Sequence, residues 1–249
     1  MQVSFVFKKE RYAFVEDHCP ENVPVIPFVS ILDLFYGKLK EYIGPCILKD
    51  IRLIKGIILS DFTDHPVIID INQEQELIQL LDIRHNVHYK AHYSLFHDGI
   101  EKPLWSDLSV VQEFPGNYQF LFHGPKLHSI VKIKKDKTGS QTIGILKTAL
   151  GMNNNQTDWF FDPFACDGAL QMGCQLAFMV KHKASLPSKI KRAVLYQKFK
   201  EETCYAHLIF HKISGLQYVF DAHLFDSQNN PICSMEGVES YFRLSKVSP

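Results

Sequence analysis

His18 is the first residue whose type and setting could support acid–base chemistry. It is one of twelve histidines in a chain of 249 residues, and it lies between a strand-like segment and an apolar helical segment. Pro20, Pro24 and Pro27 follow it and restrict the backbone of this connection. A neutral imidazole in such a place can act as a general base near pH 7. The alternative is a loop histidine with no role in chemistry.

Asp167 is the matching candidate for a general acid. It lies in the run FFDPFACDGALQ, and apolar surroundings raise the pKa of a carboxyl group because they disfavour the ion. The neutral form can then donate a proton. Gln171 follows one helical turn later, where its amide can hold the carboxyl group. The alternative is a charge that stabilises the helix N-terminus, although Asp162, directly before Pro163, fits the N-cap position better.

Two helices must position these side chains, one in each half of the chain. After Pro27, apolar residues recur at three- and four-residue steps until Gly44-Pro45, which predicts a helix. A second helix, rich in small residues, is expected from Cys166 to about Lys181. Strands are predicted on both sides of each helix: Val3 to Phe7, Tyr12 to Val15, Ile47 to Leu59, Pro66 to Ile71, Glu76 to Ile83 (which could equally form a short helix), Val87 to Phe96, Leu127 to Lys134, Thr142 to Leu150, Ile190 to Phe199, Cys204 to Lys212, Gln217 to Leu224 and Ile232 to Leu244.

The same order of elements therefore occurs twice, as a strand segment, a helix and about four strands. Both helices even begin near a Pro-Phe pair, Pro27-Phe28 and Pro163-Phe164. This repetition indicates an α+β protein made of two similar units. A long antiparallel sheet wrapped around each helix is the simplest way to bury that helix. We expect one unit over residues 1–108 and the other over 109–249, with the boundary in the stretch from Trp105 to Gly116.

Four segments resemble motifs of polyketide synthase dehydratases, and they follow one another along this chain in the same order as in that family. His18 to Pro27 resembles HxxxGxxxxP, and Asp167 to Gln171 resembles DxxxQ. Between them, Leu121-Phe-His-Gly-Pro125 resembles the (Y/H)GP segment, in the FHGP form of polyunsaturated fatty acid synthases. Leu186 to Arg192 resembles the LP-x-x-I-x-R strand. The resemblance implies a double hot-dog fold, which agrees with the two helix-and-sheet units predicted above.

The resemblance also implies an activity, the removal of water from a 3-hydroxyacyl thioester on an acyl carrier protein, in polyketide or fatty acid type biosynthesis. His18 would remove the proton beside the thioester carbonyl, and Asp167 would protonate the departing hydroxyl. Gln171 would support Asp167. Asn22 stands where the family has a glycine. In the family, a backbone N–H near this glycine is thought to polarise the thioester carbonyl. Asparagine keeps that N–H and tolerates left-handed dihedral angles, but its side chain could obstruct the carbonyl. The residues implied to line the acyl channel are Pro27, His123, Gly124, Pro125 and Pro187.

Two other readings keep the same fold. The chain could be a non-catalytic subunit of a synthase that binds an acyl chain, a reading that the substitution at Asn22 favours. It could also use His18 and Asp167 for double-bond isomerisation or aldol cyclisation. The sequence does not separate these readings.

Composition narrows the choice of partners and cofactors. The formal net charge is zero, so no nucleic acid is expected as a partner. No long apolar run predicts a membrane span, and charge follows too soon after the N-terminus for a signal peptide. The six cysteines form no CxxC pair, so we expect reduced thiols and a cytoplasmic protein. The implied reaction needs no metal and no organic cofactor. The resemblance implies a homodimer, or association with other synthase subunits.

Overall fold

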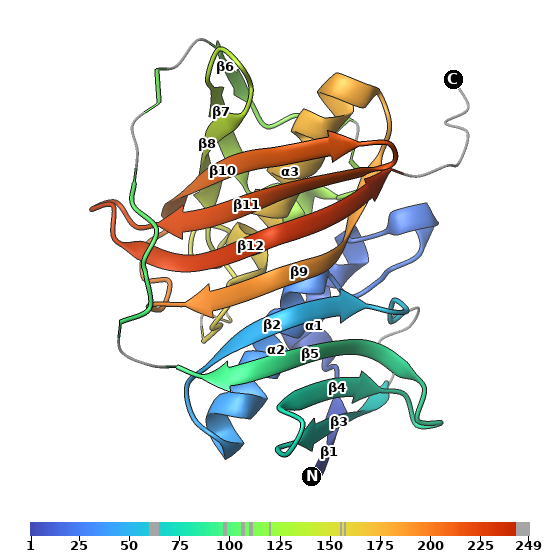
Figure 1. Cartoon of the computed structure of the whole chain (residues 1–249). Helices are drawn as coiled ribbons and strands as arrows, with labels where there is room; N and C mark the ends of the chain where they lie inside the picture. The colour runs from blue at the N-terminus through green and yellow to red at the C-terminus, as the bar shows by residue number, and fades with distance from the viewer. Residues whose placement is uncertain are drawn as a thin grey trace.

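The computed structural model of the chain describes residues 1–59, 65–96, 99–105, 108, 109, 112–119, 121–154, 156 and 158–242. In this part of the chain, twelve strands form one antiparallel sheet in the order β1-β3-β4-β5-β2-β9-β12-β11-β10-β8-β7-β6. Figure 1 shows the sheet as a curved band in front of the two long helices, α2 and α3. Each helix is therefore enclosed on one side by strands of its own half of the chain.

The first half forms one helix-and-sheet unit. Its helix, α2 (Phe28–Tyr42), is buried along most of its length, as expected for a helix at the centre of a core. Alternate residues of the strands point into the core, such as Val67, Ile69 and Ile71 of β3. The strands are β1 (Gln2–Val6), β2 (Cys46–Leu53), β3 (Pro66–Asn72), β4 (Leu77–Leu81) and β5 (Val87–Leu95).

The second half repeats this plan around α3 (Pro163–Lys181). The helix begins three residues before the expected Cys166, because Asp162 caps it: the Asp162 carboxylate accepts hydrogen bonds from the N–H groups of Phe164 and Ala165. The prediction of Asp162 as the N-cap is confirmed. The strands are β6 (Gln112–Pro115), β7 (Ile130–Lys135), β8 (Gln141–Lys147), β9 (Ser185–Leu195), β10 (Thr203–Ser214), β11 (Gln217–Phe225) and β12 (Pro231–Phe242).

The two units share one sheet because β2 pairs with β9, with Leu48 opposite Ala193. This arrangement is the α+β double hot-dog that the sequence predicts. The division at residue 108 stays a prediction, since residues 106, 107, 110 and 111 lie outside the described part of the chain. Among the described helices, none has both the length and the apolar character needed to cross a membrane.

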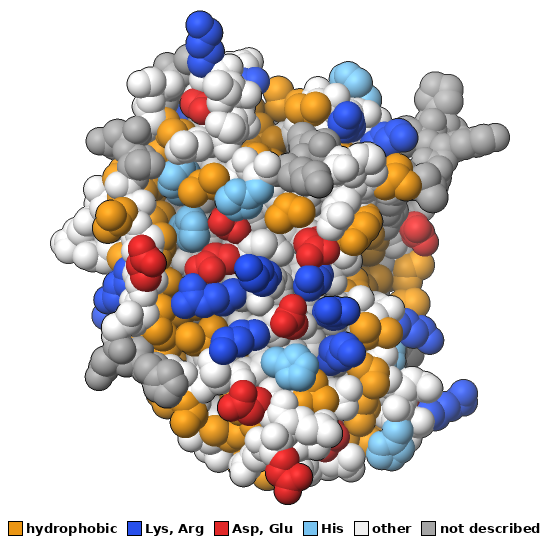
Figure 2. All heavy atoms as spheres, viewed as in Figure 1, with side chains coloured by type: hydrophobic (Ala, Val, Ile, Leu, Met, Phe, Trp, Pro, Cys, Tyr) orange, Lys and Arg blue, Asp and Glu red, His pale blue; other side chains and the backbone are white. Residues whose placement is uncertain are grey.

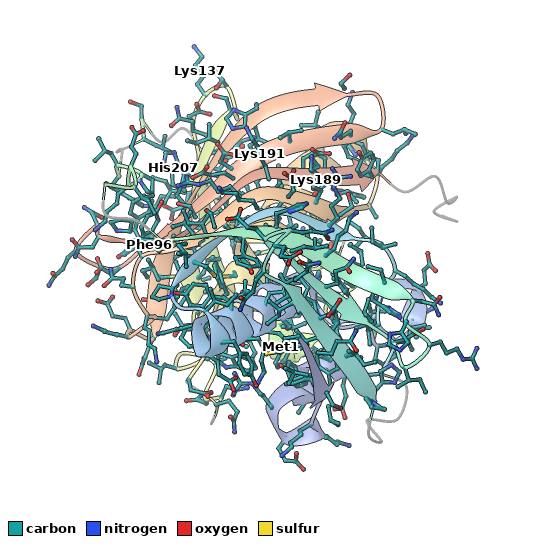
Figure 3. All side chains as sticks on the ribbon, turned by 60° about the horizontal axis from the view of Figure 1, so that its bottom comes forward. Met1, Phe96, Lys137, Lys189, Lys191 and His207 are labelled. Atoms are coloured by element: carbon teal, nitrogen blue, oxygen red, sulfur yellow. The ribbon has the colours of Figure 1, made fainter. Side chains whose placement is uncertain are left out.

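The outer face of the sheet is charged. Figure 2 shows basic and acidic side chains gathered across its middle, where the ion pairs Lys189–Glu239 and Arg192–Glu236 join β9 to β12. Lys189 and Lys191 belong to this outer face (Figure 3), whereas the intervening Ile190 is buried in the core. The alternation separates a solvated face from an inner face that contacts the helices.

One predicted strand is wrong. Tyr12 to Val15 belongs to the short helix α1 (Lys9–Tyr12) and the 3-10 turn η1 (Ala13–Asp17). Tyr12, Phe14 and Val15 are all buried, and a strand would send successive side chains to opposite faces. The turn instead buries the consecutive residues Phe14 and Val15 together, and the rings of Tyr12 and Phe14 both contact Trp159.

Candidate active site

A cavity of about 290 Å³ contains both residues that the sequence singled out for acid–base chemistry. His18 reaches it from the connection before α2, and Asp167 reaches it from the second turn of α3. Most of the remaining wall is apolar, with Phe28, Tyr89 and Leu170 among its residues. The first unit thus contributes His18, and the second contributes Asp167, to a shared and mostly apolar space.

The surroundings of His18 determine which ring nitrogen carries the proton. His18 Nδ1 lies 2.7 Å from the carbonyl oxygen of Val25, and a carbonyl oxygen only accepts hydrogen bonds. Nδ1 must therefore be the protonated nitrogen, which leaves a lone pair on Nε2. Burial lowers the pKa of His18 to about 4, even though the nearby Asp167 carboxylate favours the charged ring. The imidazole is neutral at physiological pH, as a general base must be.

Asp167 is held from two sides. Gln171 Nε2 donates a hydrogen bond of 2.6 Å to Asp167 Oδ2, as the four-residue spacing predicts. His123 Nε2 lies 3.3 Å from the same oxygen. Burial by itself would raise the pKa of Asp167, but the hydrogen bonds from His123 and Gln171 and the nearby imidazoles bring it below its ordinary value. The expectation of a raised pKa, based on apolar neighbours in sequence, is therefore wrong.

The structure adds His123 to the two residues that the sequence predicts for acid–base chemistry. The motif implies only that it lines the channel, but the structure brings one nitrogen or oxygen each of His18, His123 and Asp167 within 4.8 Å of one another. A backbone bridge pairs His18 with His123, and Phe122 stacks on the His123 ring at 4.1 Å between centroids. The FHGP motif marks this histidine in the sequence, but no local pattern indicates its contact with Asp167.

The other residues implied to line the channel divide into two groups. Pro187 lines the cavity, at the start of β9. Pro27, Gly124 and Pro125 are not part of the cavity wall. Pro27 is the buried N-cap residue of α2, and Pro125 opens the turn η3 (Pro125–Leu127). Gly124 packs on Asp17, and a Cβ added to Gly124 would lie 2.6 Å from Asp17 Cγ. These three residues shape the backbone that carries the two histidines.

Asn22 adopts the left-handed conformation, with φ at 63°, in the short turn η2 (Pro20–Asn22). Its side chain is exposed and is not part of the cavity wall, so it does not obstruct the space. Its N–H donates to the carbonyl oxygen of Cys19 at 3.1 Å. The next residue, Val23, does line the cavity, and its N–H donates no hydrogen bond within the described part of the chain. That N–H is therefore a candidate donor to a ligand in the cavity.

Replacing Asn22 by glycine should therefore change turnover by less than about twofold, and it should slightly stabilise the fold. Glycine adopts a positive φ without the steric cost that a side chain brings. The measurement is a pair of experiments, thermal unfolding and steady-state kinetics on a 3-hydroxyacyl thioester. A gain in turnover of tenfold or more would show that the asparagine side chain does impair the site.

Comparisons with known proteins place the chain in a family. A family model described as "Polyketide synthase dehydratase N-terminal domain" matches residues 117–241. The chain belongs to the polyketide synthase dehydratase family. The match covers most of the second helix-and-sheet unit, from His123 through Asp167 and Gln171 to β12, but not β6. No curated protein matches the chain in sequence.

Solved structures of polyketide synthase dehydratase domains share its fold. The dehydratase domain from the CurJ module of curacin polyketide synthase has a TM-score of 0.79 at 17% identity, and the match covers 97% of this chain and 91% of that one. The dehydratase domain of a mycocerosic acid synthase-like polyketide synthase has a TM-score of 0.83 at 13% identity, and the match covers 96% of this chain and 90% of that one. A trans-AT polyketide synthase dehydratase domain from Brevibacillus brevis has a TM-score of 0.79 at 17% identity, and the match covers 98% of this chain and 94% of that one. The predicted double hot-dog fold is confirmed.

Proposed function

We propose that this chain removes water from a 3-hydroxyacyl thioester attached to the phosphopantetheine arm of an acyl carrier protein, in polyketide or fatty acid type biosynthesis. The observation that carries the proposal is the shared cavity, in which a neutral imidazole from one unit faces a carboxylate–imidazole pair from the other. Elimination of water needs a base at C2 and an acid at the C3 hydroxyl, because hydroxide leaves poorly without a proton.

His18 serves as the base. Its Nε2 lone pair takes the C2 proton, and the resulting imidazolium keeps its Nδ1–H bond to the Val25 carbonyl. That carbonyl holds the ring in one orientation and stabilises the positive charge, the role that an orienting partner has in other acid–base sites. Proton transfer by a positioned side chain contributes about 10²- to 10⁴-fold to a rate.

Asp167 and His123 serve together as the acid. Because the pKa of Asp167 is lowered, the carboxyl group does not hold the proton alone. In the acid form of the pair, His123 carries hydrogen on both ring nitrogens and donates Nε2–H to Asp167 Oδ2, so that its ring is neutral after it gives up the Nε2 proton. This proton passes to the C3 hydroxyl as the C–O bond breaks, which releases water. His18 then returns the C2 proton to the pair, which lies within 4.8 Å, and the site regains its starting state.

A backbone N–H stabilises the enolate-like oxygen that forms between these steps. We assign this role to the N–H of Val23, because Val23 lines the cavity and its N–H donates no hydrogen bond within the described residues. A donor aimed at a developing oxyanion contributes about 3 kcal/mol in measured cases. We therefore assign the donor to Val23, one residue after Asn22, which stands at the position of the family glycine.

Turnover is tested directly with 3-hydroxyacyl pantetheine thioesters of several chain lengths, with loss of water followed by mass spectrometry. An enoyl thioester product supports the proposal. No product at any length would favour the non-catalytic acyl-binding subunit. A change of double-bond position or a cyclised product, without loss of water, would favour an isomerase or cyclase with the same two residues.

The pH dependence of kcat/KM should have its acidic limb near pH 4 instead of near the ordinary histidine pKa of about 6.5. His18 must be neutral to act as the base, and burial lowers its pKa to about 4, so activity rises with pH through this value. The limb belongs to the coupled cluster and not to one group. Steady-state kinetics between about pH 2.5 and pH 8 measure it. A limb centred near 6.5 would contradict a buried, neutral His18.

A further inference from the structure

The three side chains at the centre of the cavity also have the composition of a metal site. We propose that His18, His123 and Asp167 bind a divalent transition-metal ion such as Zn²⁺, and that the metal-loaded protein is an inactive form. Two histidines and one carboxylate with further positions left open are a known ligand set for such ions. The ion is an inhibitor in this proposal, and the dehydration itself proceeds without it.

The distances suit this role. Tetrahedral zinc with bonds of about 2.0–2.1 Å keeps its ligand atoms roughly 3.3–3.5 Å apart. His123 Nε2 and Asp167 Oδ2 lie 3.3 Å apart already. The donor atoms of all three residues lie within 4.8 Å of one another, so the third donor needs a movement of roughly 1.5 Å or less. The cavity leaves the fourth position open to water or to a ligand.

The protonation states suit it as well, because a metal needs a lone pair on each imidazole. His18 presents Nε2, since Nδ1 donates to the Val25 carbonyl, and a carbonyl in this position orients many metal-binding histidines. His123 Nδ1 is buried and has no hydrogen-bond partner within the described residues. Nothing there prevents the ring from carrying its proton on Nδ1 and presenting Nε2.

Asp167 completes the set with a negative charge in a buried place. Less than a tenth of each of the three residues is exposed, and Gln171 holds Asp167 Oδ2 in position. A cation would therefore replace the proton that His123 and Asp167 share. Metal binding also occupies the His18 lone pair and removes the acid, so the loaded protein has neither base nor proton donor. This inhibitory part rests on the proposed function, whereas metal binding itself does not.

Isothermal titration of the full chain with ZnCl₂, after removal of bound metal with a chelator, tests the binding. We expect one ion per chain, and Asp167→Asn and His123→Ala should each weaken binding by at least about tenfold. Asp167→Asn keeps the shape of the side chain, so it remains informative if His123→Ala unfolds. His211→Ala is the control, because His211 is exposed on β10 and pairs with Asp221. Cys19→Ser controls for a thiol that is partly exposed.

Co²⁺ gives an independent readout, since its visible spectrum reports the ligand set. Loss of the spectrum in Asp167→Asn, with no change in His211→Ala, supports the site. Equal Zn²⁺ affinity in the wild type and both site variants, or no stoichiometric binding, overturns it. Zinc binding without any turnover would leave the metal-binding part of this inference standing and would remove both the proposed function and the inhibitory part. Turnover that Zn²⁺ does not inhibit would remove the inference alone.

Discussion

Replacing His18 by alanine should lower kcat/KM for a 3-hydroxyacyl thioester by about 10²- to 10⁴-fold, the contribution of a positioned general base. The cavity wall within the described residues holds one other imidazole, His123, which already contacts Asp167. It cannot replace the base without giving up that contact. The loss should appear in kcat more than in KM, because the proton moves only in the transition state. Steady-state kinetics, with thermal unfolding in parallel, give both values.

His223→Ala is the matched control for this experiment. His223 is also buried and also uses Nδ1 in a hydrogen bond, to Ser234 Oγ, but it lies on β11 and does not line the cavity. It should lose stability without a comparable loss of turnover. Equal losses of turnover in His18→Ala and His223→Ala would show that His18 acts through the fold and not as a base.

Replacing Asp167 by asparagine should lower kcat by a similar factor, about 10²- to 10⁴-fold. Asparagine keeps the size of the side chain and can still accept the Gln171 hydrogen bond, but it cannot share a proton with His123. Loss of the leaving group should then limit the rate. A 3-fluoroacyl thioester tests this point, because fluoride leaves with less need of a proton. It should restore much of the rate in Asp167→Asn and little of it in His18→Ala.

Asp33→Asn provides the control for a buried carboxylate elsewhere. Asp33 accepts hydrogen bonds from the N–H groups of Phe160 and Phe161 and lies outside the cavity. This variant should lose stability, since a buried amide cannot reproduce those bonds and the Arg11 ion pair together. If the 3-fluoroacyl thioester restores the rate of His18→Ala and Asp167→Asn equally, the division of roles into base and acid is wrong.

Local sequence patterns were enough to predict the two helices and most strands. Apolar spacing after Pro27 predicts α2, and alternation predicts β3, because both patterns depend on which side of one element is buried. The prediction failed at Tyr12 to Val15. There the apolar side chains reach one cluster through a turn, and their contact with Trp159 comes from a distant part of the chain. Short apolar segments carry no information about such distant partners.

At the candidate site, too, local patterns predict some features, while others depend on residues far away in sequence. The motifs brought His18, Asp167 and Gln171 to attention, and the four-residue spacing predicted the Gln171 hydrogen bond. The pKa of Asp167 was predicted with the wrong sign, because the groups that lower it include His123 and His18, which are far away in sequence. Pro27 was expected at the wall and instead begins a helix. A motif residue can be needed for the shape of the backbone, and sequence spacing alone does not distinguish that from contact with substrate.

The joining of two similar units through β2 and β9 has a consequence for symmetry. Two identical units would create two equivalent sites, one at each helix. When the Pro-Phe pairs that begin the helices are aligned, Ile31 of α2 corresponds to Asp167, and Phe35 corresponds to Gln171. Ile31 and Phe35 are completely buried. The two halves therefore differ at this position: one helix carries the reactive groups, while the other fills the same place with hydrophobic core.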